Sequence, residues 1–221
     1  MQAFIFDFNG TLYLDMDIHR RAWKLFMSRH GQKIDDETFY RYMFGPNNSV
    51  ILRRFFGDLD EGEVWRLSGE KEALYREIAL SDPALQRLAP GAPQMLDMLK
   101  SRGVPFAIAT ASIRKNVDFY MNSLGIRRWF DYDHVFFEME GLPGKPDPSI
   151  YLLTMEKLRY DPENTVVVED SMPGRQSAVA AGVSSIIAID TTLGPDAFKE
   201  IPQVSAVIHD FFGFERFVGP D

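Results

Sequence analysis

Hydrophobic positions change their spacing along the chain, and the change separates two kinds of predicted structure. Residues 4–8 form an apolar run, broken only at Asp7, that is typical of a short buried strand. From Asp17 the period becomes helical, and this residue is the expected N-cap of the first helix. The apolar positions of that helix share one face: Ile18, Ala22, Leu25 and Phe26. Residues 16–88 show only helical patterns, which predicts a compact bundle.

Within the bundle, further helices are predicted over residues 36–43, 49–56 and 61–78. After Pro90, strands and helices alternate. The predicted strands cover residues 104–109, 134–137, 165–168, 185–189 and 206–208, and the predicted helices cover residues 93–100, 117–124, 149–158 and 174–181. Such alternation is typical of βαβ units and a parallel sheet. We therefore expect an α/β protein with a Rossmann-like core of residues 1–15 and 89–221, into which a four-helix cap of residues 16–88 is inserted.

Three of the predicted strands end in polar residues. In open parallel sheets the reactive groups collect beyond the carboxyl ends of the strands, so these residues are expected to converge. They are Asp7 with Asn9, Thr110 with Ser112, and Glu169 with Asp170. This convergence is the main functional signal in the sequence.

The residue types at these strand ends favour phosphate chemistry. Three carboxylates close together repel one another unless a cation lies among them, and an oxygen-only set suits a hard ion such as Mg²⁺. Lys145 lies on a Gly- and Pro-rich loop from which its ammonium could reach an anion. Thr110 and Ser112 offer hydroxyl and backbone donors just before a helix, which is a suitable anion cradle. The set predicts phosphoryl transfer with Asp7 as the nucleophile.

The amino-acid composition excludes several classes of function and of partner. Apolar residues make up 45% and charged residues 25% of the 221 positions, as in an ordinary globular protein. Cysteine is absent, which excludes disulfides and thiolate catalysis. The net charge of −8 argues against a nucleic-acid partner. No apolar run has membrane-spanning length and no secretory signal is visible, so we expect a cytoplasmic protein. We also expect a monomer or weak homodimer.

Four segments together resemble the haloacid dehalogenase (HAD) superfamily. They are FDFNGT at Asp7, IATAS at Thr110, GKPDP at Lys145 and VVVEDS at Glu169 and Asp170. Their order and spacing match the four motifs of that superfamily over nearly the whole chain. Within it the chain looks most like the β-phosphoglucomutase-like phosphatases, which carry a helical cap at the same insertion point.

The resemblance implies roles for individual residues. Asp7 is the implied nucleophile, and Mg²⁺ is held by the Asp7 carboxylate, the Asn9 backbone carbonyl and Asp170, with Glu169 nearby. Phosphate contacts are implied for Thr110, the Ala111 N–H and Lys145.

Asn9 departs from the family pattern, in which an aspartate protonates the leaving oxygen and then activates water. An amide keeps the backbone contact to a metal but cannot exchange a proton near neutral pH. Loss of a general acid or base typically costs about 10²–10⁴-fold in rate. Three interpretations follow. The substrate has a good leaving group, a cap residue performs the proton transfer, or the site binds ligand and hardly turns over.

The cap offers residues for the missing role. By resemblance, His19 faces the active site, Lys71 reaches substrate, and Asn47 or Asn48 reads the substrate where the family has an arginine. The unperturbed pKa of a histidine suits proton transfer at neutral pH. Without the arginine, a bidentate clamp for a second phosphate is missing, which disfavours a bisphosphate substrate.

The sequence thus predicts a Mg²⁺-dependent phosphohydrolase for a small phosphorylated metabolite, with a sugar phosphate expected. A β-phosphoglucomutase-like phosphotransferase and a weakly catalytic phospho-ligand binder remain as alternatives. His19 joins Asp7, Asn9 and Lys145 among the expected catalytic residues.

Overall fold

The computed structural model describes residues 2–139, 141–190 and 203–219. The chain divides into two compact units, an α/β unit of residues 1–14 and 87–221 and a helical unit of residues 15–86. The sequence pattern predicts a core of residues 1–15 and 89–221 and a cap of residues 16–88, so the boundaries differ by one and two residues. None of the described helices is both long and apolar enough to span a bilayer.

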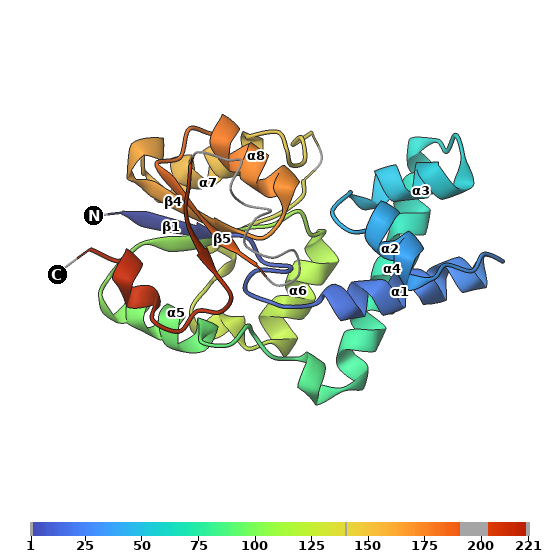
Figure 1. Cartoon of the computed structure of the whole chain (residues 1–221), viewed down its shortest axis with the longest axis horizontal. Coiled ribbons are helices and arrows are strands. Elements are labelled where there is room, and N and C mark those ends of the chain that lie inside the picture. The colour runs from blue at the N-terminus through green and yellow to red at the C-terminus, as the bar shows by residue number, and fades with distance from the viewer. Residues whose placement is uncertain (1, 140, 191–202, 220–221) are drawn as a thin grey trace. The chain divides into compact units, whose positions relative to one another are not determined.

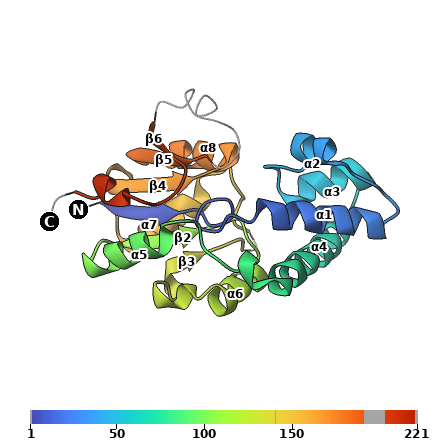
Figure 2. The same ribbon diagram turned by 60° about the horizontal axis from the view of Figure 1, so that its bottom comes forward.

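A six-stranded parallel sheet forms the α/β unit, as the alternating pattern predicts (Figures 1 and 2). Its strands are β1 (Ala3–Phe6), β2 (Phe106–Ala109), β3 (Val135–Phe136), β4 (Thr165–Glu169), β5 (Ser185–Ile189) and β6 (Val204–Ile208). They lie in the order β3-β2-β1-β4-β5-β6, and every neighbouring pair is parallel. The first strand of the chain is therefore central in the sheet.

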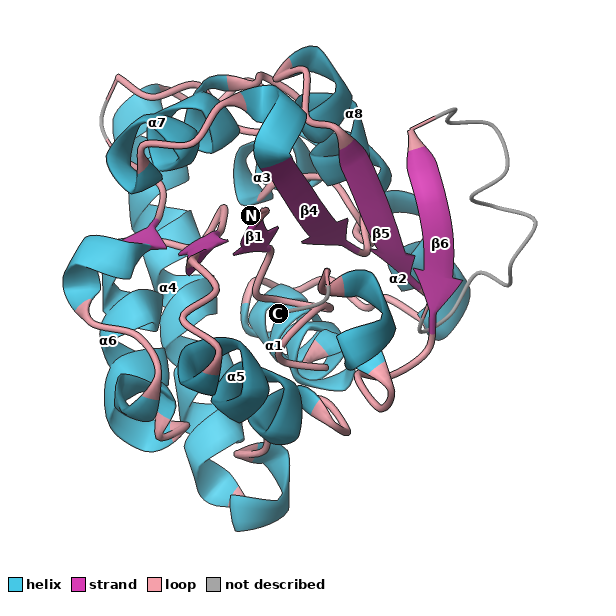
Figure 3. Cartoon of the chain, turned by 90° about the vertical axis from the view of Figure 1, so that its left-hand side faces the viewer, coloured by secondary structure: helices cyan, strands magenta, loops and turns pink. Residues whose placement is uncertain are grey.

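Helices cover both faces of this sheet. They are α5 (Ala92–Ser101), α6 (Arg114–Ser123), α7 (Ser149–Leu158) and α8 (Met172–Ala180). Figure 3 shows α7 and α8 on one face and α5 on the opposite one. Because side chains alternate along a strand, β1 contributes to both layers. Ile5 packs with Tyr151 of α7 and Ala178 of α8, whereas the Phe4 and Phe6 rings meet the ring of Phe214.

Short 3₁₀ turns link several elements and were not predicted. They are η1 (Pro83–Leu85), η2 (Ile126–Arg128), η3 (Tyr132–His134), η4 (Pro162–Asn164) and η6 (Phe214–Phe217). One of them corrects a predicted strand: His134 belongs to η3, in which the Asp133 N–H donates to the Asp131 side chain (3.1 Å), and the strand is limited to Val135–Phe136.

The helical unit contains α1 (Met16–Arg29), α2 (Asp36–Tyr42), α3 (Asn48–Phe56) and α4 (Glu61–Ser81). Helices α1 and α3 both pack against α4. Their interior is lined by large apolar side chains, including Trp23, Phe26, Leu52 and Leu74.

Two expectations about α1 were wrong. The helix begins at Met16 with Asp15 as its N-cap, two residues before the expected cap Asp17, and the Asp15 side chain accepts a hydrogen bond from the Tyr75 hydroxyl. Leu25 is 40% exposed, because the buried face is centred between Phe26 and Trp23 and Leu25 lies roughly 100° from Phe26 around the axis.

Candidate active site at the carboxyl edge of the sheet

Asp7, Lys145 and Glu169 form a buried triad at the carboxyl edge of the sheet. Strands β1 and β4 run side by side with Phe6 opposite Val168, so the residues that follow, Asp7 and Glu169, reach the same edge. Lys145 Nζ lies 2.7 Å from Asp7 Oδ1 and 2.7 Å from Glu169 Oε1. It also donates to the Ala109 carbonyl at the end of β2 (3.1 Å). Three segments distant in sequence thus meet at one ammonium group.

Burial and charge set the protonation of this triad. Burial raises the pKa of Asp7 to about 7, a shift that Lys145 opposes and Glu169 increases. Burial acts in the same direction on Glu169, but the Lys145 ammonium and the Ser171 donors outweigh it and leave the pKa of Glu169 below its usual value. Burial favours the neutral form of Lys145, but the two carboxylates outweigh it and hold its pKa well above the usual range. Asp7 is therefore the triad member that titrates near neutral pH.

Glu169 is held by more than the lysine. Its Oε2 accepts hydrogen bonds from the Ser171 backbone N–H (2.8 Å) and hydroxyl (3.0 Å), and its Oε1 accepts one from the Tyr151 hydroxyl (3.2 Å). Ser171 is also the N-cap of α8, where its Oγ accepts from the Gly174 N–H (3.1 Å). The sequence analysis did not select Ser171 or Tyr151. Ser171 stands just before a helix start that contains proline, which is a sequence signal for an N-cap. Tyr151 has no comparable signal in the sequence.

Asp170 completes a group of three carboxylates. One oxygen each from Asp7, Glu169 and Asp170 lie within 4.8 Å of one another, a donor set that suits a hard divalent cation such as Mg²⁺. Gly10 makes room for it: a Cβ there would lie 2.1 Å from Asp170 Oδ2, and its φ of +77° also favours glycine. Arg175 Nη1 donates to the Asp170 carbonyl (2.6 Å), which fixes the backbone behind this carboxylate.

Asn9 and the two hydroxyls after β2 form a second group beside the triad. Asn9 Oδ1 accepts hydrogen bonds from Ser112 Oγ (2.7 Å) and Thr110 Oγ1 (3.3 Å). Its Nδ2 donates to the hydroxyl of Tyr120 on α6 (2.8 Å), a residue that the sequence analysis did not select. Ala111 lies between the two hydroxyl residues and is exposed. The predicted motif-one and motif-two residues are therefore in direct contact.

His19 and Lys71 lie together in the helical unit. Lys71 Nζ is 2.7 Å from His19 Nδ1 and 2.8 Å from Glu72 Oε1, and it is buried. An ammonium group has only donors, so His19 Nδ1 is the acceptor and its proton lies on Nε2, 3.3 Å from Asp15 Oδ2. Burial acts to raise the pKa of Glu72, but the Lys71 ammonium, which also donates a hydrogen bond to it, outweighs burial and lowers the value to about 2. Both ring nitrogens of His19 thus have partners within its own unit.

The two predicted substrate-reading asparagines differ in their contacts. Asn48 Nδ2 donates to Glu72 Oε1 (2.8 Å) and to Ser68 Oγ (2.9 Å), so Asn48 joins the cluster around Lys71. Asn47 stands apart from it as the N-cap of α3, where its Oδ1 accepts from the Val50 N–H (3.1 Å). Substrate contacts by either residue stay a prediction.

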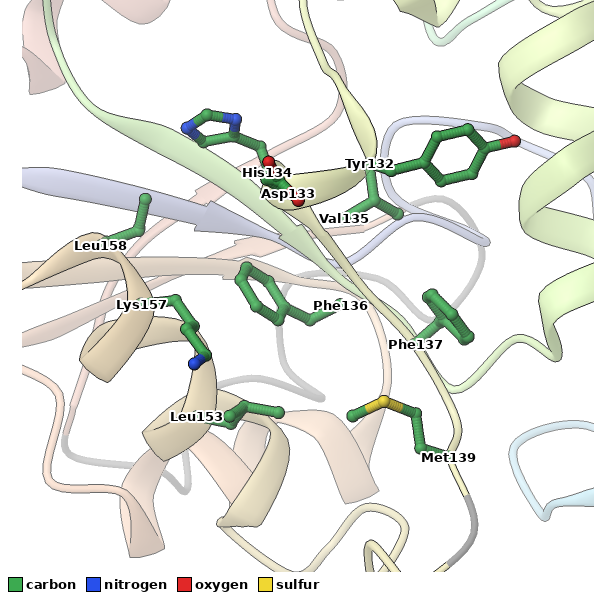
Figure 4. A pocket seen from close by; sticks show the side chains of 10 residues that line it. All are labelled: Tyr132, Asp133, His134, Val135, Phe136, Phe137, Met139, Leu153, Lys157 and Leu158. Carbon is green, nitrogen blue, oxygen red and sulfur yellow. The ribbon is translucent and has the colours of Figure 1, made fainter.

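A pocket of about 500 Å³ lies elsewhere on the α/β unit, beside the edge strand β3 (Figure 4). It is lined by residues 132–137 with Met139 and by Leu153, Lys157 and Leu158 of α7. None of the predicted site residues lines it, so it is separate from the carboxylate group.

Comparison with protein families identifies the chain. The model of the haloacid dehalogenase-like hydrolases matches residues 1–182. The chain belongs to this family. It is 28% identical over 193 residues to a phosphorylated carbohydrates phosphatase of Thermotoga maritima, a match that covers 86% of the chain and 85% of the relative.

Solved structures agree with this assignment. A family IA, variant 3 HAD hydrolase from Entamoeba histolytica superposes with a TM-score of 0.88 at 30% identity, covering 96% of the chain and 94% of that structure. The β-phosphoglucomutase from Clostridium difficile superposes with a TM-score of 0.78 at 23% identity, covering 98% and 95%. The chain therefore has the β-phosphoglucomutase-like fold of this hydrolase family.

Proposed function

We propose that the chain is a Mg²⁺-dependent phosphohydrolase for a phosphorylated carbohydrate and that Asp7 is its nucleophile. The observation that carries the proposal is the placement of Asp7, which lies 2.7 Å from a buried lysine and within 4.8 Å of two further carboxylates. Family membership and similarity to a phosphorylated carbohydrates phosphatase support the reaction and the substrate class.

Asp7 and Asp170 are the proposed ligands of the cation. Both carboxylate oxygens of Glu169 instead accept hydrogen bonds, from Lys145 and Tyr151 on Oε1 and from Ser171 on Oε2. We therefore assign Glu169 the role of positioning Lys145. The Asn9 backbone carbonyl is a further proposed ligand. Bound Mg²⁺ would keep Asp7 ionised and withdraw charge from the phosphate oxygens.

The reaction proceeds in two displacements. The Asp7 carboxylate attacks phosphorus, the bond from phosphorus to the sugar oxygen breaks, and the electron pair leaves with that oxygen, which takes a proton from water. A second water then attacks phospho-Asp7, so that inorganic phosphate is released and the carboxylate is restored. Lys145 stabilises the negative charge of the phosphate group, while Thr110, the Ala111 N–H and Ser112 supply hydrogen bonds to its oxygens.

Two alternatives differ from hydrolysis in a measurable way. A phosphotransferase would return the phosphoryl group to a second sugar hydroxyl. Because Asn9 cannot activate water, phospho-Asp7 would live longer, which favours transfer to a sugar over hydrolysis. A phospho-ligand binder would bind phosphate without turnover.

The test is release of inorganic phosphate from a panel of sugar phosphates and acyl phosphates with and without Mg²⁺. We expect Mg²⁺-dependent release by the native chain and none by Asp7→Asn. Asp97→Asn is the matched control, because this surface aspartate also pairs with a cation, Arg128, outside the site. Release by Asp7→Asn at the native rate excludes the proposed nucleophile. Conversion of glucose 1-phosphate to glucose 6-phosphate without phosphate release identifies the phosphotransferase.

A further inference from the structure

Asn9 Oδ1 uses the hydroxyl protons that the proposed phosphate site requires. Thr110 and Ser112 both donate to this oxygen, at 3.3 and 2.7 Å. A hydroxyl has one proton and can donate to one acceptor at a time. The Thr110 oxygen in turn accepts from the Ser112 backbone N–H (3.2 Å). A phosphate oxygen that accepts from either hydroxyl must therefore displace Asn9 Oδ1.

Tyr120 holds the amide in this position. Asn9 Nδ2 donates to Tyr120 Oη (2.8 Å), and Tyr120 Oη lies 3.0 Å from Ser112 Oγ. Because the Ser112 proton is donated to Asn9 Oδ1, the Tyr120 proton is assigned to Ser112 Oγ. The three groups then form a closed ring of hydrogen bonds that runs in one direction. The tyrosine itself is fixed, since it is 1% exposed and its ring centroid lies 4.4 Å from that of Phe8.

We propose that the Asn9 amide competes with the phosphate group of the substrate for the hydroxyls of Thr110 and Ser112, and that Tyr120 is the positioning residue that anchors the amide there. The inference rests on the proposed function, because it takes these hydroxyls as phosphate donors. Phosphate binding then includes breaking the ring, and the anchor lowers phosphate affinity. Removal of the Tyr120 hydroxyl should strengthen phosphate binding, the opposite of what a phosphate-supporting residue would do.

The test is calorimetric titration of inorganic phosphate in the presence of Mg²⁺. Tyr120→Phe keeps the buried ring and removes the hydroxyl, and a net hydrogen bond corresponds to about a two- to ten-fold gain in phosphate affinity. Asn9→Ala should also bind phosphate more tightly than the native chain. Because Tyr120 acts through Asn9, Tyr120→Phe should add nothing in the Asn9→Ala background. Tyr132→Phe is the control, since it removes a hydroxyl that binds Asp118 outside the ring.

A second measurement follows the amide directly. The side-chain NH₂ signals of Asn9, assigned by their loss in Asn9→Ala, should shift in ¹⁵N-labelled protein on addition of phosphate and in Tyr120→Phe without it. Unchanged or weaker phosphate binding by Tyr120→Phe, or an equal gain in the Asn9→Ala background, overturns the inference while the phosphohydrolase proposal stands. Absence of phosphate binding in every variant rejects both. If Tyr120→Phe does not fold, the shift of the Asn9 signals on addition of phosphate to the native protein still tests displacement of the amide, and its absence overturns the inference.

Discussion

Gly174 and Glu169 occupy adjoining space: a Cβ atom on Gly174 would lie 1.6 Å from Glu169 Oε1 and 2.5 Å from Oε2. Gly174 lies in the first turn of α8, and Glu169 is fully buried at the end of β4. The position of the carboxylate that pairs with Lys145 therefore requires a glycine here.

Gly174→Ala should displace Glu169 and with it Lys145. We expect a loss of kcat of about tenfold or more, because a small misplacement of a catalytic group has a large effect on rate. Steady-state phosphatase assays and thermal unfolding measure both effects. Gly69→Ala is the matched control: Gly69 lies inside α4 with nothing within 4 Å of its Cβ position. This control should gain about 1 kcal/mol of helix stability. Equal activities of the two variants would show that Glu169 adjusts without consequence.

Mg²⁺ affinity should depend on pH through Asp7. Its pKa of about 7 means that the carboxyl is protonated at lower pH, whereas a cation requires it ionised. Proton and metal therefore compete, and Mg²⁺ affinity should fall about tenfold per pH unit below 7 and level off above it. The low pKa of Glu169 keeps this neighbour ionised throughout. Calorimetric titration from pH 5.5 to 8.5 measures the slope, and a slope that persists in Asp7→Asn would assign it to another group.

Asn9→Asp should increase turnover of alkyl phosphates. An aspartate can protonate the leaving oxygen and activate water, so we expect a gain of about 10²-fold or more in kcat. Acyl phosphates need less leaving-group protonation and should gain less. Parallel assays of a sugar phosphate and acetyl phosphate test this difference. Equal gains for both substrates would argue that the second displacement alone limits the rate.

Lys71→Met should destabilise the protein. Lys71 is 1% exposed and pairs with the buried Glu72 at 2.8 Å, so the substitution leaves a buried carboxylate without its ammonium partner. The expected loss is about 3 kcal/mol in the free energy of unfolding, measured by urea denaturation. Lys24→Met is the control, because Lys24 pairs with Asp36 at the surface and should contribute about 1 kcal/mol or less. A loss no larger than this would show that the other partners of Glu72, among them Asn48, stabilise the carboxylate without the ammonium.

The fold was accessible from the sequence because two periods alternate clearly. Short apolar runs marked the six strands, and their alternation with helices indicated the parallel sheet. Strand order was not predicted, since long-range pairing leaves no local pattern. The N-cap of α1 was predicted wrongly because Asp15 and Asp17 are both suitable caps, and only the tertiary contact with Tyr75 distinguishes them.

The candidate site was predicted as far as strand ends determine it. Asp7, Lys145 and Glu169 meet because parallel strands bring their carboxyl ends together. Tyr120 and Tyr151 have no such signal. Each is an aromatic residue on a helix with no motif around it, and only packing against the sheet directs its hydroxyl to Asn9 or Glu169.

The central position of β1 has a consequence for the order of folding during synthesis. Strand β1 is made first, yet its neighbours are β2, more than a hundred residues later, and β4, which begins at Thr165. The helical unit lies between them in the sequence and is closed by contacts within residues 15–86. On the ribosome this unit can fold while β1 is still unpaired, and the carboxylates of Asp7 and Glu169 meet only once β4 has emerged.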